Sequence, residues 1–336
     1  MVDNAHILPL NADVALEELA ANAVAVGLPM NTPFRETTLR EVMLIKGPIG
    51  WAEFSPFPEY GAQESARWLS ATIEAGWHGW PEPVRQSVPV NATVPAVAPK
   101  DVETVLARFG PVTAVKVKVA EDDVATDIAR VQRVRELLPD ADIRIDGNTK
   151  YSHDEAFEVI TALPFLAYAE QPVPGIEPLA KLRAALRDAG SSVLIAADEA
   201  VRKETDPLAV AQAQAADLIV VKVQPLGGVR RALSIVQHAG LDAVVSSALD
   251  SSVGIAAGVA LAAALPSLDH ACGLATAALF RTEPAQPALP VNGVLTPGPA
   301  PEPDAQLIEQ LKLPDERQRW WQTRLAKAHS VLTQNA

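Results

Sequence analysis

Hydrophobic residues in the middle of the chain gather in short runs that alternate with longer amphipathic segments. Uninterrupted runs of Val, Ile and Ala are typical of parallel strands buried on both faces, and the segments between them are typical of helices. The pattern predicts strands at 90–94, 114–119, 143–146, 166–170, 193–197, 218–222, 243–246 and 271–273. It predicts helices at 102–109, 124–138, 154–163, 176–187, 207–214, 229–239 and 252–265. This α/β alternation predicts a closed (β/α) barrel of the TIM type.

The two ends of the chain have a different pattern. Residues 12–24 read as a helix, residues 37–57 as two strands around a Gly-Pro turn, and residues 64–77 as an amphipathic helix. A proline-rich connection after the barrel leads to a helix that contains RQRWWQTRLAKAH, and we expect this tail to run back onto the N-terminal segment. The predicted domains are an α+β domain of residues 1–87 plus 286–336 and a barrel of residues 88–285.

An open, doubly wound sheet is the main rival to a barrel, but the chain has no glycine-rich fingerprint after an early strand. Five ionisable residues also stand at the C-terminal ends of apolar runs, at intervals of 28, 24, 28 and 24 residues. These intervals are close to the ~31 residues per unit of an eight-fold barrel. A closed barrel gathers such tips at one rim. They are Lys118, Asp146, Glu170, Asp198 and Lys222.

Three carboxylates that meet at one rim repel one another unless a hard divalent cation neutralises them. Asp146, Glu170 and Asp198 therefore predict an Mg²⁺ site, for which Mn²⁺ is a candidate substitute. Lys116 shares a strand face with Lys118, because side chains on a strand repeat every second residue. The lysines then supply bases beside the metal, and the whole pattern predicts metal-dependent proton transfer.

A simpler interpretation exists for each of these residues taken alone. The acids could cap helices or lie on the surface, the K-x-K pair could lie on a solvated edge strand, and Lys222 could extend from its strand end into water. The common spacing and the apolar flanks of all five positions favour the shared site.

Four further residues are candidates for substrate contact. Arg144 precedes Asp146 by two positions on the same strand face, and Asn148 follows it by two. Ser246 and Ser247 end the seventh strand, where hydroxyl and backbone N–H groups suit a carboxylate. The serines just beyond them could equally cap the next helix.

Composition excludes several other classes. A net charge of −13 without a Lys/Arg cluster disfavours nucleic acid. The start lacks the basic and apolar segments of a secretory signal, and the apolar run 253–265 is shorter than the ~20 residues of a membrane span. One cysteine, Cys272, excludes an intrachain disulfide and a thiolate zinc cage, so we expect a cytoplasmic protein. The sequence leaves the oligomeric state open, a monomer included.

The motifs K-x-K, R-x-D-x-N, E-Q-P, A-D-E and V-K-V-Q-P-L-G-G resemble the enolase superfamily in its muconate-lactonising subgroup. GWAEFSPFPEYG (50–61), VNATVPAV (90–97), RIDGN (144–148) and SSALDSSVG (246–254) resemble more closely its o-succinylbenzoate synthase family, of the actinobacterial type. The resemblance covers nearly the whole chain from about Gly27 onward.

The resemblance implies a modified barrel under a capping domain built from both termini, with Mg²⁺ held by Asp146, Glu170 and Asp198. It implies that Lys118 is the base, that Lys116 keeps it poised, and that Lys222 lies on the other face of a small anionic substrate. A loop at 28–36 would close over that substrate. The implied reaction is a syn-dehydration in menaquinone biosynthesis.

Two alternatives remain open at this stage. The enzymatic one is racemisation of N-succinylamino acids or epimerisation of dipeptides, with Lys118 and Lys222 as two bases. The other is a barrel that has lost catalysis and serves as a binding or scaffold protein, which the complete set of five groups disfavours.

Overall fold

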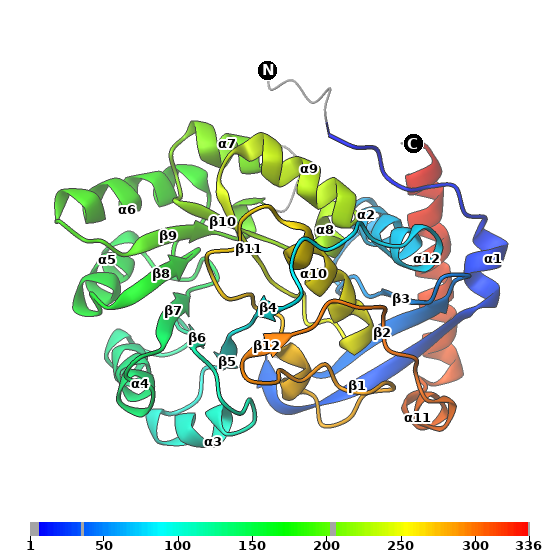
Figure 1. Cartoon of the computed structure of the whole chain (residues 1–336), viewed down its shortest axis with the longest axis horizontal. Helices are drawn as coiled ribbons and strands as arrows, with labels where there is room; N and C mark the ends of the chain where they lie inside the picture. Colours follow the sequence, from blue (N-terminus) through cyan, green and yellow to red (C-terminus); the bar gives the residue numbers. More distant parts are fainter. Residues whose placement is uncertain (1–6, 35–36, 202–205, 335–336) are drawn as a thin grey trace.

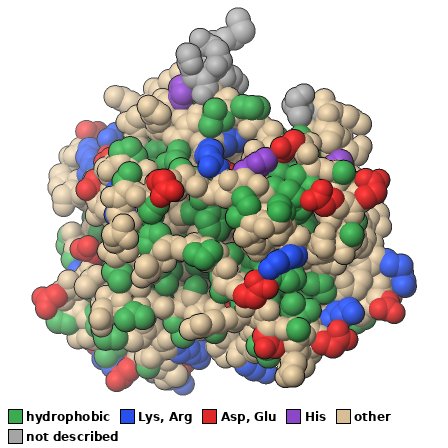
Figure 2. Space-filling view, turned by 45° about the vertical axis from the view of Figure 1, so that its right-hand side comes forward, with side chains coloured by type: hydrophobic (Ala, Val, Ile, Leu, Met, Phe, Trp, Pro, Cys, Tyr) green, Lys and Arg blue, Asp and Glu red, His purple; other side chains and the backbone are tan. Residues whose placement is uncertain are grey.

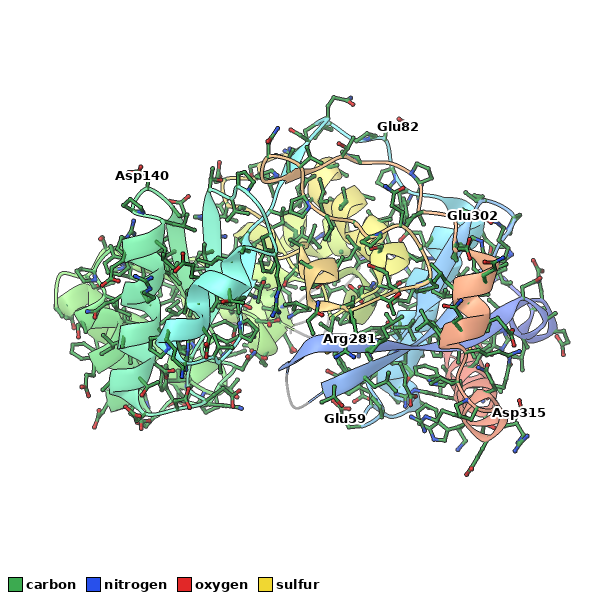
Figure 3. All side chains as sticks on the ribbon, turned by 90° about the horizontal axis from the view of Figure 1, so that it is seen from below. Glu59, Glu82, Asp140, Arg281, Glu302 and Asp315 are labelled. Carbon is green, nitrogen blue, oxygen red and sulfur yellow. The ribbon has the colours of Figure 1, made fainter. Side chains whose placement is uncertain are left out.

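The computed structural model describes residues 7–34, 37–201 and 206–334, which form a barrel and a smaller α+β unit beside it (Figure 1). Figure 3 shows the two units side by side, with Asp140 on the barrel and Glu59 and Asp315 on the smaller unit. The smaller unit contains segments from both ends of the chain, as the sequence predicted.

The barrel is built on a seven-stranded parallel sheet in the order β11-β10-β9-β8-β7-β6-β5, so each strand pairs with its neighbours in sequence. This regular order is what repeated strand-helix units produce. The strands are β5 (Ala92–Val94), β6 (Ala114–Lys118), β7 (Asp142–Asp146), β8 (Leu166–Glu170), β9 (Leu194–Ala197), β10 (Leu218–Val221) and β11 (Asp242–Val245).

The eighth predicted strand, at 271–273, is not a regular strand. It makes two isolated parallel bridges, from Cys272 to Val90 and from Gly273 to Ser246. These bridges join the two edges of the sheet and close the cylinder. The two isolated bridges do not form a continuous ladder, so the segment does not count as a strand, although its place in the fold is the one that the sequence predicted.

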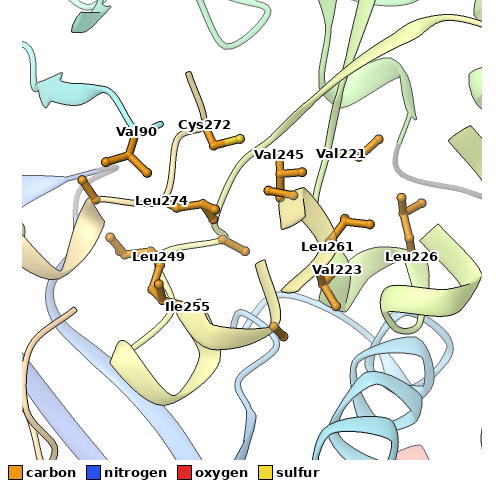
Figure 4. Packing of buried hydrophobic residues seen from close by; sticks show 14 of the residues in the cluster. Val90, Val221, Val223, Leu226, Val245, Leu249, Ile255, Leu261, Cys272 and Leu274 are labelled. Carbon is orange, nitrogen blue, oxygen red and sulfur yellow. The ribbon is translucent and has the colours of Figure 1, made fainter. Parts of the chain in front are cut away.

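Alternation along the strands separates two layers of side chains. Odd-numbered residues such as Val117, Ile145 and Val221 belong to the main hydrophobic core, which the helices cover. Figure 4 shows Val221 and Val245 near Leu261 of helix α10. From β6 to β11, even-numbered residues face the barrel interior, where an apolar cluster is made by Tyr168, Ala196, Leu218, Val220 and Val244. On β5 the phase is reversed, because Thr93 is the register partner of Lys116. The period of two therefore places Lys116, Lys118, Asp146 and Glu170 inside the barrel, whereas Asp142 at the start of β7 is exposed.

The short helix at Val223–Leu226 was not predicted, but the other helices of the barrel follow the sequence prediction closely, and local capping explains several boundaries. Asp123 accepts a hydrogen bond from the Thr126 N–H at the start of α4, and Ser152 and Glu155 form a capping box at the start of α5. The helices are α3 (Val102–Leu106), α4 (Val124–Leu137), α5 (His153–Ala162), α6 (Ile176–Asp188), α7 (Asp206–Gln212), α8 (Val223–Leu226), α9 (Val229–Ala239) and α10 (Ser252–Ala264).

The smaller unit contains an antiparallel sheet of β1 (Ala23–Phe34), β2 (Thr37–Lys46) and β3 (Trp51–Phe54). Its helices are α1 (Leu16–Ala21), α2 (Ala62–Ile73), α11 (Ala305–Leu311) and α12 (Asp315–Gln334). The turn after α2, Glu74–His78, is a π-helix. A short strand of the returning tail, β12 (Val294–Leu295), pairs with β4 (Val88–Pro89).

Two predictions at the N-terminus were wrong. The predicted helix at 12–24 is helical only over Leu16–Ala21, and the predicted loop at 28–36 is the second half of β1 as far as Phe34. Residues 35 and 36 lie outside the described residues. The physical reason is pairing: AVAVGLP (23–29) aligns with LREVMLI of β2 over seven consecutive pairs, and Leu28 is fully buried.

The C-terminal tail returns to this sheet as predicted. Trp321 of α12 is fully buried and donates from Nε1 to Glu41 Oε2 of β2 at 2.9 Å. Arg324 donates to the carbonyls of Phe57 at 2.6 Å and Tyr60 at 2.8 Å. The predicted domain boundaries remain a prediction, but these contacts fix the tail on the N-terminal segment.

The run 253–265, predicted to be a buried helix, forms most of α10, whose residues are nearly all buried. No helix in the described part of the chain is both long and apolar enough to cross a membrane. On the face drawn in Figure 2, Lys and Arg side chains are scattered among acidic ones and do not form a basic patch.

Candidate active site at the barrel mouth

The five predicted tips meet at the carboxyl ends of the barrel strands. Lys118, Asp146 and Glu170 are the last residues of β6, β7 and β8, and they are partners in the register of these neighbouring strands. Asp198 and Lys222 directly follow β9 and β10. The three carboxylates are 1–3% exposed, so their charges depend on protein partners.

Those partners are the lysines. Lys116 Nζ lies 2.9 Å from Glu170 Oε1 and 3.2 Å from Asp146 Oδ2. Lys118 Nζ lies 2.5 Å from the same Asp146 oxygen, and Lys222 pairs with Asp198. Three cations thus face three anions in a nearly buried cluster, which confirms that the K-x-K pair points into the barrel.

The carboxylates lie close enough to repel one another. Burial raises the pKa of Glu170 to about 8, and repulsion from Asp146 adds to the rise while Lys116 opposes it. Burial alone would lower the pKa of Lys116, but attraction to Glu170 and Asp146 outweighs burial, so this pKa is raised. A further positive charge among these oxygens would relieve the repulsion that remains.

Within the described ranges, no group of three His, Cys, Asp or Glu side chains is arranged to hold a metal ion as it stands. Each of the three carboxylates is turned toward a lysine instead. Their chemistry nevertheless fits a hard divalent ion, because three carboxylates on adjacent strands are the oxygen donors that such an ion takes, with substrate and water as further ligands.

Asn148 belongs to the same cluster. Its Oδ1 accepts from Lys118 Nζ at 2.6 Å, its N–H donates to Asp146 Oδ1 at 3.1 Å, and its Nδ2 donates to Glu199 Oε1 at 3.1 Å. The residue adopts a left-handed conformation with φ of 42°, which asparagine tolerates better than most residues. Asn148 therefore holds the base candidate and one carboxylate in a fixed relation.

Ser246 and Ser247 line a small cavity of about 30 Å³ that also touches Lys116, Lys118, Asp146, Asp198 and Lys222. Ser247 shares a 2.8 Å hydrogen bond with Thr276. Ser251, not these two residues, caps α10 by accepting from the Val253 N–H. The capping alternative thus holds for Ser251, while Ser246 and Ser247 face the site.

Arg144 is not brought to this mouth. Its side chain is fully buried in the barrel interior, where Nη1 donates to Ala271 O at 2.7 Å and the guanidinium lies 4.9 Å from the Tyr168 ring centroid. It lines neither of the cavities at the mouth. Strand periodicity correctly predicted that Arg144 points inward, but it did not give the depth of the side chain along the barrel axis.

A second cavity, of about 340 Å³, adjoins the first between α2 and α8. Phe57, Asp198, Lys222 and Ala248 line both. The remaining wall is largely apolar, with Tyr60, Trp68, Val201, Val220, Pro225 and Leu226, and Gln63, Glu64 and Arg67 add polar groups. This volume lies at the lower end of the about 300–1,000 Å³ of ligand pockets.

Sequence reasoning gave no role to Phe57, Thr93 and Thr276, which also line the small cavity. Thr93 lies on β5, one of the predicted barrel strands, and could have been found from the inward face of that strand. Phe57 and Thr276 lie outside the regular strands, so no periodicity marks them.

Comparison with known proteins gives the class of this fold and site. Residues 99–302 match the family described as enolase C-terminal domain-like, and residues 25–76 match the enolase N-terminal domain-like family. Among solved structures, muconate lactonizing enzyme from Pseudomonas putida superposes with a TM-score of 0.70 at 19% identity, covering 87% of this chain and 98% of that one. The enzyme from Pseudomonas fluorescens complexed with muconolactone gives 0.73 at 18% identity, with the same coverage. The chain belongs to the enolase superfamily, whose enzymes use a divalent metal ion.

Closer relatives narrow the family further. The chain is 47% identical over 327 residues to an o-succinylbenzoate synthase from Mycolicibacterium smegmatis, covering 96% of this chain and 99% of the relative. It is 48% identical over 316 residues to an o-succinylbenzoate synthase from Thermobifida fusca, covering 92% and 96%. Within the superfamily, the chain belongs to the o-succinylbenzoate synthase family.

Proposed function

We propose that this enzyme carries out the Mg²⁺-dependent syn-dehydration of 2-succinyl-6-hydroxy-2,4-cyclohexadiene-1-carboxylate to 2-succinylbenzoate, as a step of menaquinone biosynthesis. The observation that carries the proposal is the buried cluster of three lysines and three carboxylates in a chain of this family. The single cysteine, buried and free, fits a cytoplasmic enzyme.

Asp146, Glu170 and Asp198 would hold Mg²⁺, with Mn²⁺ as a substitute, through their carboxylate oxygens. When bound there, the ion supplies Lewis-acid stabilisation of the negative charge that the substrate carboxylate accumulates as the adjacent C–H bond breaks, an effect of several kcal/mol. The anionic substrate also meets a mouth where Lys116 and Lys222 carry compensating charge.

Lys118 removes the proton from the carbon that bears the carboxylate. The amine must be neutral to accept it, and Asn148 and Asp146 fix its position by contacts of 2.6 and 2.5 Å. The ammonium formed then donates this proton to the hydroxyl on the neighbouring carbon, which leaves as water from the same face. One proton and one hydroxide are lost in total, and the ring becomes aromatic.

Lys222 lies across the mouth from Lys118 and faces the second cavity. We assign it to the opposite face of the ring, where an ammonium stabilises negative charge and can lie against the π-system. Lys116 keeps its proton because Glu170 and Asp146 surround it, and its charge favours a neutral Lys118. Ser246 and Ser247 are assigned to substrate contact, since both line the small cavity.

The test is product formation by the Lys118→Ala variant. Loss of the amine that takes the proton should abolish formation of 2-succinylbenzoate. A matched control is Lys150→Ala, because Lys150 is an exposed lysine that pairs with Glu121 at 2.6 Å outside the cluster. Near-normal kcat in Lys118→Ala would contradict the assignment.

Racemisation of N-succinylamino acids is the second candidate, and one observation favours it. The largely apolar 340 Å³ cavity beside Lys222 offers room for an amino-acid side chain, and lysines on two sides can exchange a proton at one carbon. Incubation of an N-succinylamino acid in D₂O tests it: deuterium enters the α-carbon if both lysines act as bases, and its absence rejects this activity.

A further inference from the structure

Arg40 on β2 of the smaller unit reaches across to the barrel. The residue is 2% exposed. Nε donates to Leu249 O at 3.1 Å, and Nη2 donates to Ser55 O at 2.5 Å and to Ala248 O at 3.5 Å. Leu249 and Ala248 belong to the loop between β11 and α10, so one side chain ties the capping sheet to a barrel loop.

The groups that Arg40 holds are walls of the active site. Its Cζ lies 4.2 Å from the centroid of the Phe57 ring, a stacking distance for a guanidinium. Phe57 and Ala248 line both cavities, and Leu249 lines the smaller one. Arg40 itself lines neither cavity, so it acts on a substrate only through these neighbours.

The backbone of this loop is also strained. Leu249 has φ of 60°, a left-handed conformation that costs energy in a residue other than glycine. Its carbonyl is the one that Arg40 Nε binds. Such a conformation persists when surrounding contacts hold it in place. The hydrogen bond from the Arg40 guanidinium is one of these contacts.

Two buried carboxylates complete the arrangement. Glu53 accepts from the Ser251 N–H at 2.9 Å and from the Ser55 hydroxyl at 2.5 Å, and Asp250 Oδ2 accepts from the Ala248 N–H at 3.1 Å. Both are 2–3% exposed and both attract Arg40. The Arg40 guanidinium is therefore held in one place, and its hydrogen bonds hold the β11–α10 loop in place as well.

We propose that Arg40 is a positioning residue for the dehydration, which sets Phe57 and the Ala248–Leu249 backbone against the substrate beside Lys222. The expected effect on kcat rests on the proposed function, whereas the expected effect on the loop does not. A planar guanidinium is required, because it binds three carbonyls and a ring face at once, whereas a lysine ammonium cannot reproduce that fork.

The variants Arg40→Lys and Arg40→Met test this proposal. Arg187 provides the matched controls Arg187→Lys and Arg187→Met, since its guanidinium also binds two carbonyls and a carboxylate, of Ser191, Val193 and Asp217, away from the mouth. All variants are compared at a temperature where circular dichroism shows them folded. If Arg40→Met does not fold, the kinetics of Arg40→Lys alone test the proposal.

We expect both Arg40 variants to lose kcat by about 10²-fold, the effect of a displacement near 1 Å at a reacting site. The Arg187 variants should melt earlier but keep kcat within about 3-fold, because surface and peripheral contacts act on stability and not on site geometry. Equal kcat in Arg40→Lys, the wild type and Arg187→Lys would overturn the proposal.

A second readout does not depend on turnover. Hydrogen exchange of peptides that span 246–252 should speed up in Arg40→Lys and remain unchanged in Arg187→Lys. If the wild type fails to dehydrate the substrate, the proposed function fails, yet exchange still tests whether Arg40 holds the loop. Unchanged exchange in Arg40→Lys overturns the positioning role even when the wild type is active.

Discussion

The barrel mouth and the seam between the capping sheet and the β11–α10 loop are both buried and charged, but they are assembled differently. At the mouth, Lys118 pairs with Asp146, the facing residue on the next strand. At the seam, Arg40 binds Leu249, 209 residues away, and Glu53 binds Ser251, 198 residues away. The reactive groups are thus specified by local strand patterns, and their placement depends on contacts between distant segments.

The charge balance differs as well. The mouth matches three lysines with three carboxylates, whereas the seam places one arginine among the carboxylates of Glu53 and Asp250. Burial, followed by repulsion from Glu53, raises the pKa of Asp250 to about 7. The carboxylates of the mouth are therefore suited to bind an added cation, whereas Asp250 at the seam is suited to retain a proton.

The largest expected effect is at the mouth. Asp146→Asn removes one proposed metal ligand and the partner of two lysines, so kcat/KM should fall about 10³-fold or more, in line with a Lewis-acid contribution of several kcal/mol. Titration calorimetry should also show weaker Mg²⁺ binding. Asp142→Asn, at the exposed opposite end of β7, is the control, and equal activity of the two variants would contradict the metal assignment.

A smaller loss is expected when the connection around the base is cut. Asn148→Ala removes the amide between Lys118 and Glu199, so the ammonium loses one fixed contact. We expect kcat to fall about 10–100-fold, as for other groups that orient a reactive side chain, with little change in KM. Steady-state kinetics measures this, and a change confined to KM would assign Asn148 to substrate binding alone.

At the seam, packing should affect both stability and rate. A Cβ added at Gly254 of α10 meets Glu53 Oε2 at 2.9 Å and Asp250 Cβ at 2.8 Å, so Gly254→Ala pushes the carboxylate away from Ser251. Overpacking of this kind costs about 1–3 kcal/mol of unfolding free energy. Gly298→Ala, where a Cβ meets nothing within 4 Å, is the control for urea denaturation. Equal urea midpoints for Gly254→Ala and Gly298→Ala would show that the side chains at the seam move aside without a cost in stability.

The smallest effect concerns pH. The pKa of Asp250 rises on folding from 3.8 to about 7, so the folded state retains a proton there that the unfolded state releases. This contribution to stability is fully present below pH 3.8 and is lost as pH rises through about 7. Asp250→Asn should flatten the fall in melting temperature across this window, whereas Glu82→Gln, at an exposed position, should not.

The mouth could be predicted because its residues repeat with the strand-helix unit and alternate with period two along each strand. The same rule correctly predicted that Arg144 points inward, but alternation gives the face of a side chain and not its depth in the barrel. The eighth strand was placed correctly but is reduced to bridges at Cys272 and Gly273.

The seam could not be predicted. Arg40 follows Leu39 in a half-exposed strand pattern and reads as an ordinary surface position, and only the approach of the β11–α10 loop buries it. The helix predicted at 12–24 failed for a related reason, because pairing with β2 decided the conformation of residues from Ala23 onward. Sequence periodicity describes an element and does not identify its distant partner.

In the proposed mechanism, Asp146, Glu170 and Asp198 hold a divalent ion where Lys118 takes a proton. The most direct measurement is turnover of the cyclohexadiene carboxylate by the purified protein, before and after chelation and again after Mg²⁺ is restored. We expect 2-succinylbenzoate formation to stop with chelator and to return with Mg²⁺. Turnover that continues unchanged in the chelator would contradict it.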